Sequence, residues 1–317
     1  MAQAEKLVFC GTPQFAVPTL EKLVDAGFDV PLVLTQPDRP KGRGLELVAS
    51  RVKRTAMRLG LPIYQPEKIK QNEELRAKLE EISPAAIIVV GYGRIIPKWM
   101  LDLPKYGNIN LHASLLPKYR GAAPIQWAIA NGETVTGVTT MRIDEGLDTG
   151  DILLQKELAV LDDDTSETIA PRLAAIGAEL MIETLRGLAQ NSVTARSQDN
   201  SDASLAPVLK KEDARIDFSR TAQEIYNRFR GFQPWPGAFT TFRRRGLTMT
   251  AITRALVGIS HKVPPAQLHA EDRRLFVGCG QSTAIEVLEL QAEGKRPVSA
   301  RDFINGYRPQ TGEIFGQ

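Results

Sequence analysis

The sequence predicts an α/β protein in which a doubly wound, mostly parallel sheet is followed by a small β-barrel or sandwich. In the first part, short apolar runs alternate with helical patterns, as in proteins built from βαβ units. One run, at residues 85–93, is continuously apolar and β-branched, which is typical of strands buried on both faces. In the second part, short strand-like runs are broken by Gly and Pro. A chain of 317 residues is long enough for two domains.

The elements of the first part follow one another in strand–helix order. Residues 6–11 are a strand candidate, and residues 13–27 form a helical pattern that ends at Gly27. Residues 35–44 are rich in Pro and Gly and are expected to form a loop. The alternation predicts a Rossmann-like sheet. Its other strands are expected at 29–35, 61–66, 85–93, 108–112, 136–144 and 150–160, and its other helices at 48–60, 74–82 and about 166–190.

The composition changes near residue 190, where a polar stretch poor in apolar residues begins. We therefore expect a first domain at 1–190, a linker at 191–208 and a second domain at 209–317. The second domain is expected to hold one helix and several short strands. These elements are the helix at 221–232 and strands at 237–242, 247–256, 273–280 and 283–291.

Composition and motifs argue against several classes of protein. No apolar run approaches the roughly 20 residues that span a bilayer, and the start lacks the order of a signal peptide. Cys10 and Cys279 lie far apart, outside any metal or redox spacing. The strand-to-helix turn at 9–16 carries one glycine, so the dinucleotide-binding fingerprint fails, and neither a P-loop nor a zinc-ligand spacing is visible. We expect a cytoplasmic monomer without disulfides or metal.

The net charge of +3 is unevenly distributed along the chain. Residues 1–208 carry 23 basic and 26 acidic side chains, whereas residues 209–317 carry 17 basic and 11 acidic ones. Six basic residues also fall between Pro37 and Arg54, in and after the expected loop. Both features fit contact with a polyanion such as a nucleic-acid backbone, and both also fit an ordinary solvated surface.

Polar side chains of a catalytic kind end the strand at 108–112. Because successive side chains of a strand face opposite ways, Asn108, Asn110 and His112 share one face. An amide donor beside an imidazole can stabilise an oxyanion and move a proton. The alternative is a buried His and Asn that are satisfied by neighbouring backbone groups. An acidic, Gly-interrupted loop at 144–151 could supply a carboxylate that sets the tautomer and pKa of the imidazole.

Several separated motifs resemble a known family. N-x-H-x-S-L-L-P-x-x-R-G at 110–121 and D-x-G-L-D-T-G-D at 144–151 resemble the signature of the formyltransferases that use 10-formyltetrahydrofolate. Within that superfamily, GTPQFA, TQPDRPKGRG, GAAPIQ and PWPGAF resemble the methionyl-tRNA branch. The motifs agree in order and span nearly the whole chain. The resemblance implies transfer of a formyl group from the folate N10 to the α-amine of methionine on initiator tRNA.

The resemblance also implies roles for particular residues. Asn110 would donate its amide to the oxyanion, His112 would be a second donor and proton carrier, and Asp148 would hold the imidazole. The folate would contact Ser114, Leu115, Leu116 and Pro117, and its pterin would meet the strand-end loop that contains Val90, Gly91 and Tyr92. No metal is implied.

For the second substrate, the resemblance implies that the basic loop enters the acceptor end of the tRNA. The second domain would be an OB-like barrel whose basic face follows the tRNA backbone. The basic residues expected to contact tRNA are Arg39, Lys41, Arg43, Lys210, Lys211, Arg228, Arg230, Arg243, Arg244 and Arg245. Three other functions stay open from the sequence: a formyltransferase for a small amine or nucleotide sugar, a formyl-folate hydrolase, and a non-catalytic RNA-binding module.

Overall fold

The computed structural model of the chain describes residues 5–41, 46–254, 263–310 and 312–317. The chain divides into two compact units that interleave along the sequence. Unit 1 consists of Met1–Pro124, Val135–Ala159 and Ala170–Pro207, and unit 2 of Ile125–Thr134, Val160–Ile169 and Val208–Gln317. Among the described residues, no helix is both long enough and apolar enough to cross a membrane. The domain bounds expected from the sequence stay a prediction.

Unit 1 is built on a seven-stranded sheet in the order β5-β2-β1-β6-β7-β8-β9. The first five strands of this order run parallel, and β7, β8 and β9 pair antiparallel. The prediction of a mostly parallel α/β sheet is therefore confirmed. The strands are β1 (Lys6–Gly11), β2 (Asp29–Leu34), β5 (Ile63–Tyr64), β6 (Ala86–Val90), β7 (Asn108–His112), β8 (Val135–Arg142) and β9 (Ile152–Ala159).

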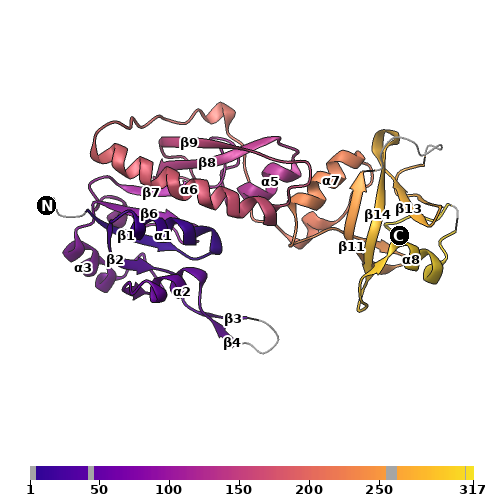
Figure 1. Cartoon of the computed structure of the whole chain (residues 1–317), viewed down its shortest axis with the longest axis horizontal. Helices are drawn as coiled ribbons and strands as arrows, with labels where there is room; N and C mark the ends of the chain where they lie inside the picture. The colour runs from indigo at the N-terminus through magenta and orange to yellow at the C-terminus, as the bar shows by residue number, and fades with distance from the viewer. Residues whose placement is uncertain (1–4, 42–45, 255–262, 311) are drawn as a thin grey trace. The chain divides into compact units, whose positions relative to one another are not determined.

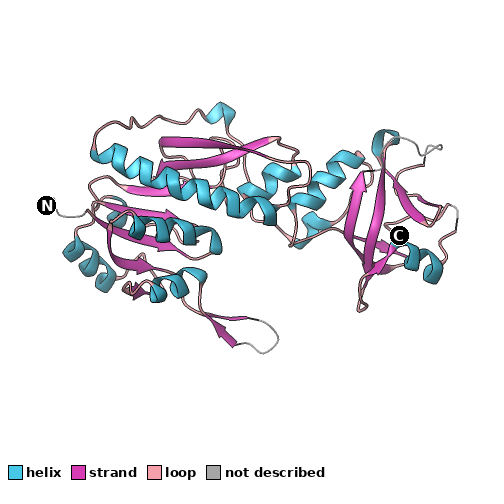
Figure 2. Cartoon of the chain, in the orientation of Figure 1, coloured by secondary structure: helices cyan, strands magenta, loops and turns pink. Residues whose placement is uncertain are grey.

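Helices cover both faces of this sheet (Figure 2). On one face, Leu75 and Leu79 of α3 pack against Val8 of β1 and Ile87 of β6 in one buried cluster. On the other face, α6 approaches β7 closely, because Gly177 lies against the side chain of Leu111. The helices of unit 1 are η1 (Gln14–Ala16), α1 (Val17–Asp25), α2 (Arg51–Arg58), α3 (Glu73–Ile82), α4 (Lys98–Leu101), α6 (Ser166–Ala189) from Ala170 onward, and η2 (Asn200–Asp202).

Part of the region expected to be a loop at 35–44 forms a short strand instead. β3 (Arg39–Lys41) pairs antiparallel with β4 (Glu46–Val48), and the hairpin extends away from the main sheet (Figure 1). The Pro and Gly residues misled the prediction because a proline without an N–H is tolerated in an isolated two-stranded ribbon. Three helices were not predicted from the sequence: α4, α5 (Pro124–Ala130) and the last helix, α8 (Ala300–Tyr307).

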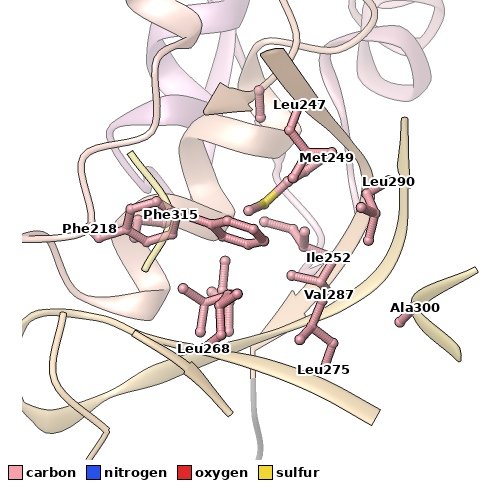
Figure 3. Packing of buried hydrophobic residues seen from close by; sticks show 14 of the residues in the cluster. Phe218, Leu247, Met249, Ile252, Leu268, Leu275, Val287, Leu290, Ala300 and Phe315 are labelled. Carbon is pink, nitrogen blue, oxygen red and sulfur yellow. The ribbon is translucent and has the colours of Figure 1, made fainter. Parts of the chain in front are cut away.

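Unit 2 contains an antiparallel sheet in the order β10-β11-β14-β13-β12, with β15 paired to β14. Its core includes Met249, Ile252, Val287 and Phe315, which Figure 3 shows packed together. The predicted small β domain after the α/β part is thus confirmed. Its elements are α5 from Ile125 onward, η3 (Lys211–Ala214), α7 (Ala222–Gly231), β10 (Phe239–Phe242), β11 (Arg245–Arg254), β12 (Leu268–Glu271), β13 (Arg274–Gly278), η4 (Gly280–Ser282), β14 (Ala284–Ala292), β15 (Val298–Ser299) and α8, together with the first turn of α6 before Ala170.

Candidate active site

Three sequence motifs meet at the carboxyl ends of parallel strands in unit 1. Gly11 at the end of β1 is in register with Val90 at the end of β6, and Val89 of β6 is in register with Asn110 of β7. Ligands of open α/β sheets bind outside the carboxyl ends of the strands. This edge therefore holds the GTPQFA turn, the VVGYG loop and the Asn-x-His motif together.

The two asparagines of β7 differ in their surroundings. Asn108 is buried, and its amide donates to the backbone oxygens of Met100 (2.8 Å) and Leu101 (3.2 Å). The alternative raised by the sequence, a buried side chain satisfied by neighbouring backbone groups, therefore applies to Asn108. Asn110 is half-buried, and within the described part of the chain its carboxamide has no hydrogen-bond partner. Asn110 is thus available to a ligand, whereas Asn108 is not.

His112 is 6% exposed, with a backbone carbonyl at one ring nitrogen and a carboxylate near the other. Its Nε2 lies 2.8 Å from the backbone oxygen of Tyr119, and because a carbonyl can only accept, Nε2 carries a proton. Its Nδ1 lies 3.7 Å from Oδ2 of Asp148. The tautomer of His112 is therefore set by the Tyr119 carbonyl rather than by a carboxylate, which the sequence did not reveal. In the neutral ring, Nδ1 is the nitrogen that can accept a proton.

Asp148 is the acidic-loop residue that faces the imidazole. Its Oδ2 also accepts the backbone N–H of Gly121 at 2.8 Å. Asp144 accepts from Thr149 within its own loop, and Asp151 accepts from Ser197. The structure therefore brings Asp148 and His112 together. A proton gained by Nδ1 would be stabilised by the adjacent carboxylate.

The segment expected to contact folate, residues 114–117, is held by hydrogen bonds to the backbone of every second residue. Thr139 of β8 donates to the backbone oxygen of Ser114 (2.7 Å) and accepts the N–H of Leu116 (3.1 Å). Ser114 and Leu116 are buried, whereas Leu115 and Pro117 are half-buried. Only the latter two therefore present side-chain surface, and the folate contacts expected for all four residues stay a prediction.

The loop after β6 is held from two other motifs. The backbone oxygen of Tyr92 accepts from Thr12 (3.3 Å) and from Gln36 (2.8 Å). The Tyr92 ring is buried in the same core cluster as Leu75, and Val90 is also buried. Gly91 is exposed. Of the three residues expected to meet a pterin, Gly91 is therefore the one with a free surface.

The basic hairpin is fixed at its base. Asp38 accepts from Lys53 (2.6 Å) and from Gln65 (2.9 Å), and the bond from Lys53 holds the pKa of the Asp38 carboxyl below its ordinary value. Arg39 is exposed, and within the described residues it has no ion-pair partner. Lys41 is described through its backbone in β3, and Arg43 lies outside the described residues.

Of the basic residues of unit 2 expected to contact tRNA, five are exposed and two are partly or fully buried. Lys210, Lys211, Arg244 and Arg245 are exposed; Arg243 is exposed too, but it makes a two-point ion pair with Glu313 at 2.7 and 2.8 Å. Two predicted tRNA contacts are less accessible.

Arg230 is 6% exposed and donates to the backbone oxygens of Leu161 and Asp164, so it does not belong to an exposed basic face. Arg228 is half-buried, with its guanidinium over the rings of Trp127 and Phe232, and desolvation lowers its pKa. The sequence pattern placed these residues on one basic helix but could not show which side of it is covered.

No group of three or more His, Cys, Asp or Glu side chains in the described ranges is arranged to hold a metal ion.

Two family descriptions match this chain. Residues 5–185 match "Formyl transferase", and residues 208–308 match "Formyl transferase, C-terminal domain". A protein named methionyl-tRNA formyltransferase from Koribacter versatilis is 62% identical over 311 residues, which cover 98% of each chain. A protein of the same name from Acidobacterium capsulatum is 60% identical over 301 residues, covering 95% of this chain and 96% of the relative.

Solved structures share the fold at lower identity. The sugar 3N-formyl transferase WlaRD, crystallised with dTDP and 5-N-formyl-THF, is 21% identical with a TM-score of 0.67, covering 93% of this chain and all (100%) of that one. An N-formyltransferase from Helicobacter canadensis, in complex with folinic acid and dTDP-3-aminofucose, is 20% identical with a TM-score of 0.67, covering 91% and 99%. On the family descriptions and the identities to curated relatives, the chain belongs to the formyl transferase family.

Proposed function

We propose that this chain transfers the formyl group of 10-formyltetrahydrofolate to the α-amine of methionine esterified to initiator tRNA. The observation that carries the proposal is the free carboxamide of Asn110 two residues before an imidazole whose Nδ1 faces Asp148 at 3.7 Å. The names of relatives at 60% and 62% identity support the choice of acceptor.

The reaction forms a bond between the amine nitrogen and the formyl carbon and breaks the bond between that carbon and the folate N10. The N–H of Asn110 stabilises the oxygen that becomes negative while both bonds exist. Nδ1 of His112 accepts the proton that the amine must lose, because Nε2 already donates to Tyr119. Asp148 stabilises the imidazolium until the proton passes to the departing N10.

The donor is a folate in this proposal, and the half-buried residues Leu115 and Pro117 with the exposed Gly91 supply surface for it. The acceptor tRNA is bound by Arg39 and Lys41 of β3, by Arg43, which lies outside the described residues, and by the exposed Lys210, Lys211, Arg244 and Arg245. These contacts are to phosphates, so they supply affinity with little sequence reading. A monomeric state and a cytoplasmic location remain predictions.

The test is formyl transfer from labelled 10-formyltetrahydrofolate with three acceptors in parallel: methionyl initiator tRNA, methionyl elongator tRNA and a dTDP-amino sugar. The proposal predicts selective labelling of the initiator tRNA. Labelling of the amino sugar would instead indicate a formyltransferase for a small amine or nucleotide sugar. Release of formate without an acceptor would indicate a formyl-folate hydrolase. RNA binding that is indifferent to formyl-folate would indicate a binding module.

A further inference from the structure

The polar segment that follows α6 packs on unit 1, against the loop that carries Asp148. The backbone of Arg196 pairs with that of Ile152 through two hydrogen bonds, at 2.8 and 2.9 Å. Ser204 accepts the N–H of Arg120 at 2.8 Å, and Ala206 donates its N–H to the backbone oxygen of Arg120 at 2.7 Å. A segment expected from its polarity to be a linker is therefore tied to unit 1 at two places, at Ile152 of β9 and at Arg120.

Gln198 lies between these two ties and contacts the Asp148 loop directly. Its Nε2 donates to the backbone oxygens of Asp148 (2.9 Å) and Gly150 (2.7 Å). Its Oε1 accepts from Nε of Arg120 at 3.0 Å. Because a guanidinium can only donate, the amide oxygen must face Arg120, and this directs the two amide hydrogens at the two carbonyls.

The side chain of Arg120 is buried and is held by hydrogen bonds. It is 6% exposed, its Nη1 donates to Asn200 at 2.9 Å, and no carboxylate pairs with it within the described residues. Its neighbour Gly121 donates its N–H to the carboxylate of Asp148. Asp148 is thus held at two points: its carboxylate accepts from Gly121, and its backbone oxygen accepts from Gln198, which Arg120 orients.

The backbone of Asp148 needs such support. Its φ is 53°, in the left-handed region that non-glycine residues rarely adopt. Residues in this region persist only where their surroundings over-determine them, and they gather at functional sites. The carboxylate meets His112 at 3.7 Å, so a change in the Asp148 backbone would move it relative to the imidazole.

We propose that Gln198 is a positioning residue for catalysis: it holds the Asp148 backbone in the conformation that presents the carboxylate to His112. This inference rests on the proposed function, since it assigns Gln198 a role in that reaction.

The experiment compares Gln198→Met and Gln198→Glu with the full-length wild type. Met keeps the length of the side chain but removes both hydrogen-bonding groups, whereas Glu keeps an oxygen for Arg120 and removes the donor toward the two carbonyls. Both variants are expected to lower kcat about ten- to a hundredfold, because small displacements of catalytic groups have effects of this size. KM for formyl-folate is expected to stay unchanged. Ser197→Ala is the matched control, since Ser197 contacts the same loop through Asp151.

A double-mutant cycle with Asp148→Asn separates positioning from general destabilisation. If Gln198 acts through Asp148, its substitution should cost little once the carboxylate is gone. Additive losses in single-turnover rate, normal kcat in both Gln198 variants, or an equal loss in Ser197→Ala would each overturn the inference. A wild type that fails to formylate methionyl-tRNA refutes the proposed function instead, so the two failures are distinguishable. If Gln198→Met does not fold, the Glu variant, which retains the Arg120 contact, decides.

Discussion

At the scale of single residues, the two asparagines of β7 have the same side chain on the same strand face but opposite surroundings. Asn108 donates to two backbone oxygens in the interior, whereas the described residues offer Asn110 no partner. A buried amide that bonds to backbone carbonyls contributes to stability, and a free amide at a strand end is available for a ligand. The sequence pattern could not separate these roles, because alternation places both residues on one face.

This contrast gives a matched pair of substitutions. Asn110→Ala is expected to lower kcat by roughly 10²–10³, as when one oxyanion donor is removed, with little change in melting temperature. Asn108→Ala is expected to cost about 1–3 kcal/mol of unfolding free energy, since two buried carbonyls lose their donor. Steady-state kinetics and thermal unfolding measure both. A near-normal rate for Asn110→Ala would remove this residue from the mechanism.

Short motifs in the sequence predicted Asn110, His112 and Asp148 as the candidate catalytic residues, but they could not predict the groups that orient these side chains. The Tyr119 carbonyl belongs to the backbone, and because every residue has such a group, the amino-acid type at position 119 does not predict this contact. Gln198 lies 50 positions from Asp148 in a polar stretch with linker-like composition. Contacts between residues so far apart in the sequence depend on the tertiary fold, so local sequence patterns do not predict them.

At the scale of elements, prediction succeeded where burial dictates the pattern. β1 and β6 are buried along almost their entire length, so their continuous apolar runs were visible in the sequence. The hairpin of β3 and β4 was missed because its residues pack against little and Pro40 reads as a loop signal. Short helices such as α4 are fixed by tertiary packing of one or two residues, which gives no periodic signal.

The turn between β7 and α5 depends on one glycine. Gly121 has a φ of +123°, and a Cβ there would lie 2.6 Å from the backbone oxygen of Ala206. Gly121→Ala is therefore expected to lower the unfolding free energy by about 1–3 kcal/mol and to lower kcat, because its N–H anchors Asp148. Thermal unfolding and kinetics measure the two effects.

The control for this substitution is Gly60→Ala, at a φ of +68° with nothing within 4 Å of the added Cβ. It carries the cost of a left-handed alanine without the clash or the link to Asp148. Equal kcat losses in both variants would mean that the Gly121 effect is general destabilisation.

The hairpin of β3 and β4 makes a prediction about substrate use. Arg39→Ala should raise KM for methionyl-tRNA and leave KM for formyl-folate unchanged, because an exposed arginine on this hairpin would contact phosphate. It should also reduce the slope of log affinity against log salt by about 1. Arg58→Ala is the control, since this exposed arginine of α2 already pairs with Glu21. Equal changes in both KM values would indicate a disturbed fold rather than a lost contact.

At the scale of the whole molecule, charge is the property that distinguishes the parts of the chain. Residues 209–317 carry 17 basic and 11 acidic side chains, whereas 1–208 carry 23 and 26. The structure reduces the number of free cations below these counts, because Arg243 pairs with Glu313, Arg274 pairs with Glu286 and Arg230 is buried. The sequence therefore indicated the sign of the surplus, and the structure shows, within the described residues, that these three arginines do not contribute a free charge to it.

This remaining surplus predicts that tRNA binding depends steeply on salt. Each neutralised phosphate releases counterions, so about six contacts would weaken binding roughly a thousandfold between ~50 and ~200 mM salt. Formyl-folate binding should change little over the same range, because its expected contacts are Leu115, Pro117 and backbone groups. Filter binding of initiator tRNA and kinetic titration of formyl-folate at matched salt concentrations measure the two dependences. A flat tRNA titration would contradict phosphate contacts as the source of tRNA affinity, and it would favour the small-amine acceptor instead.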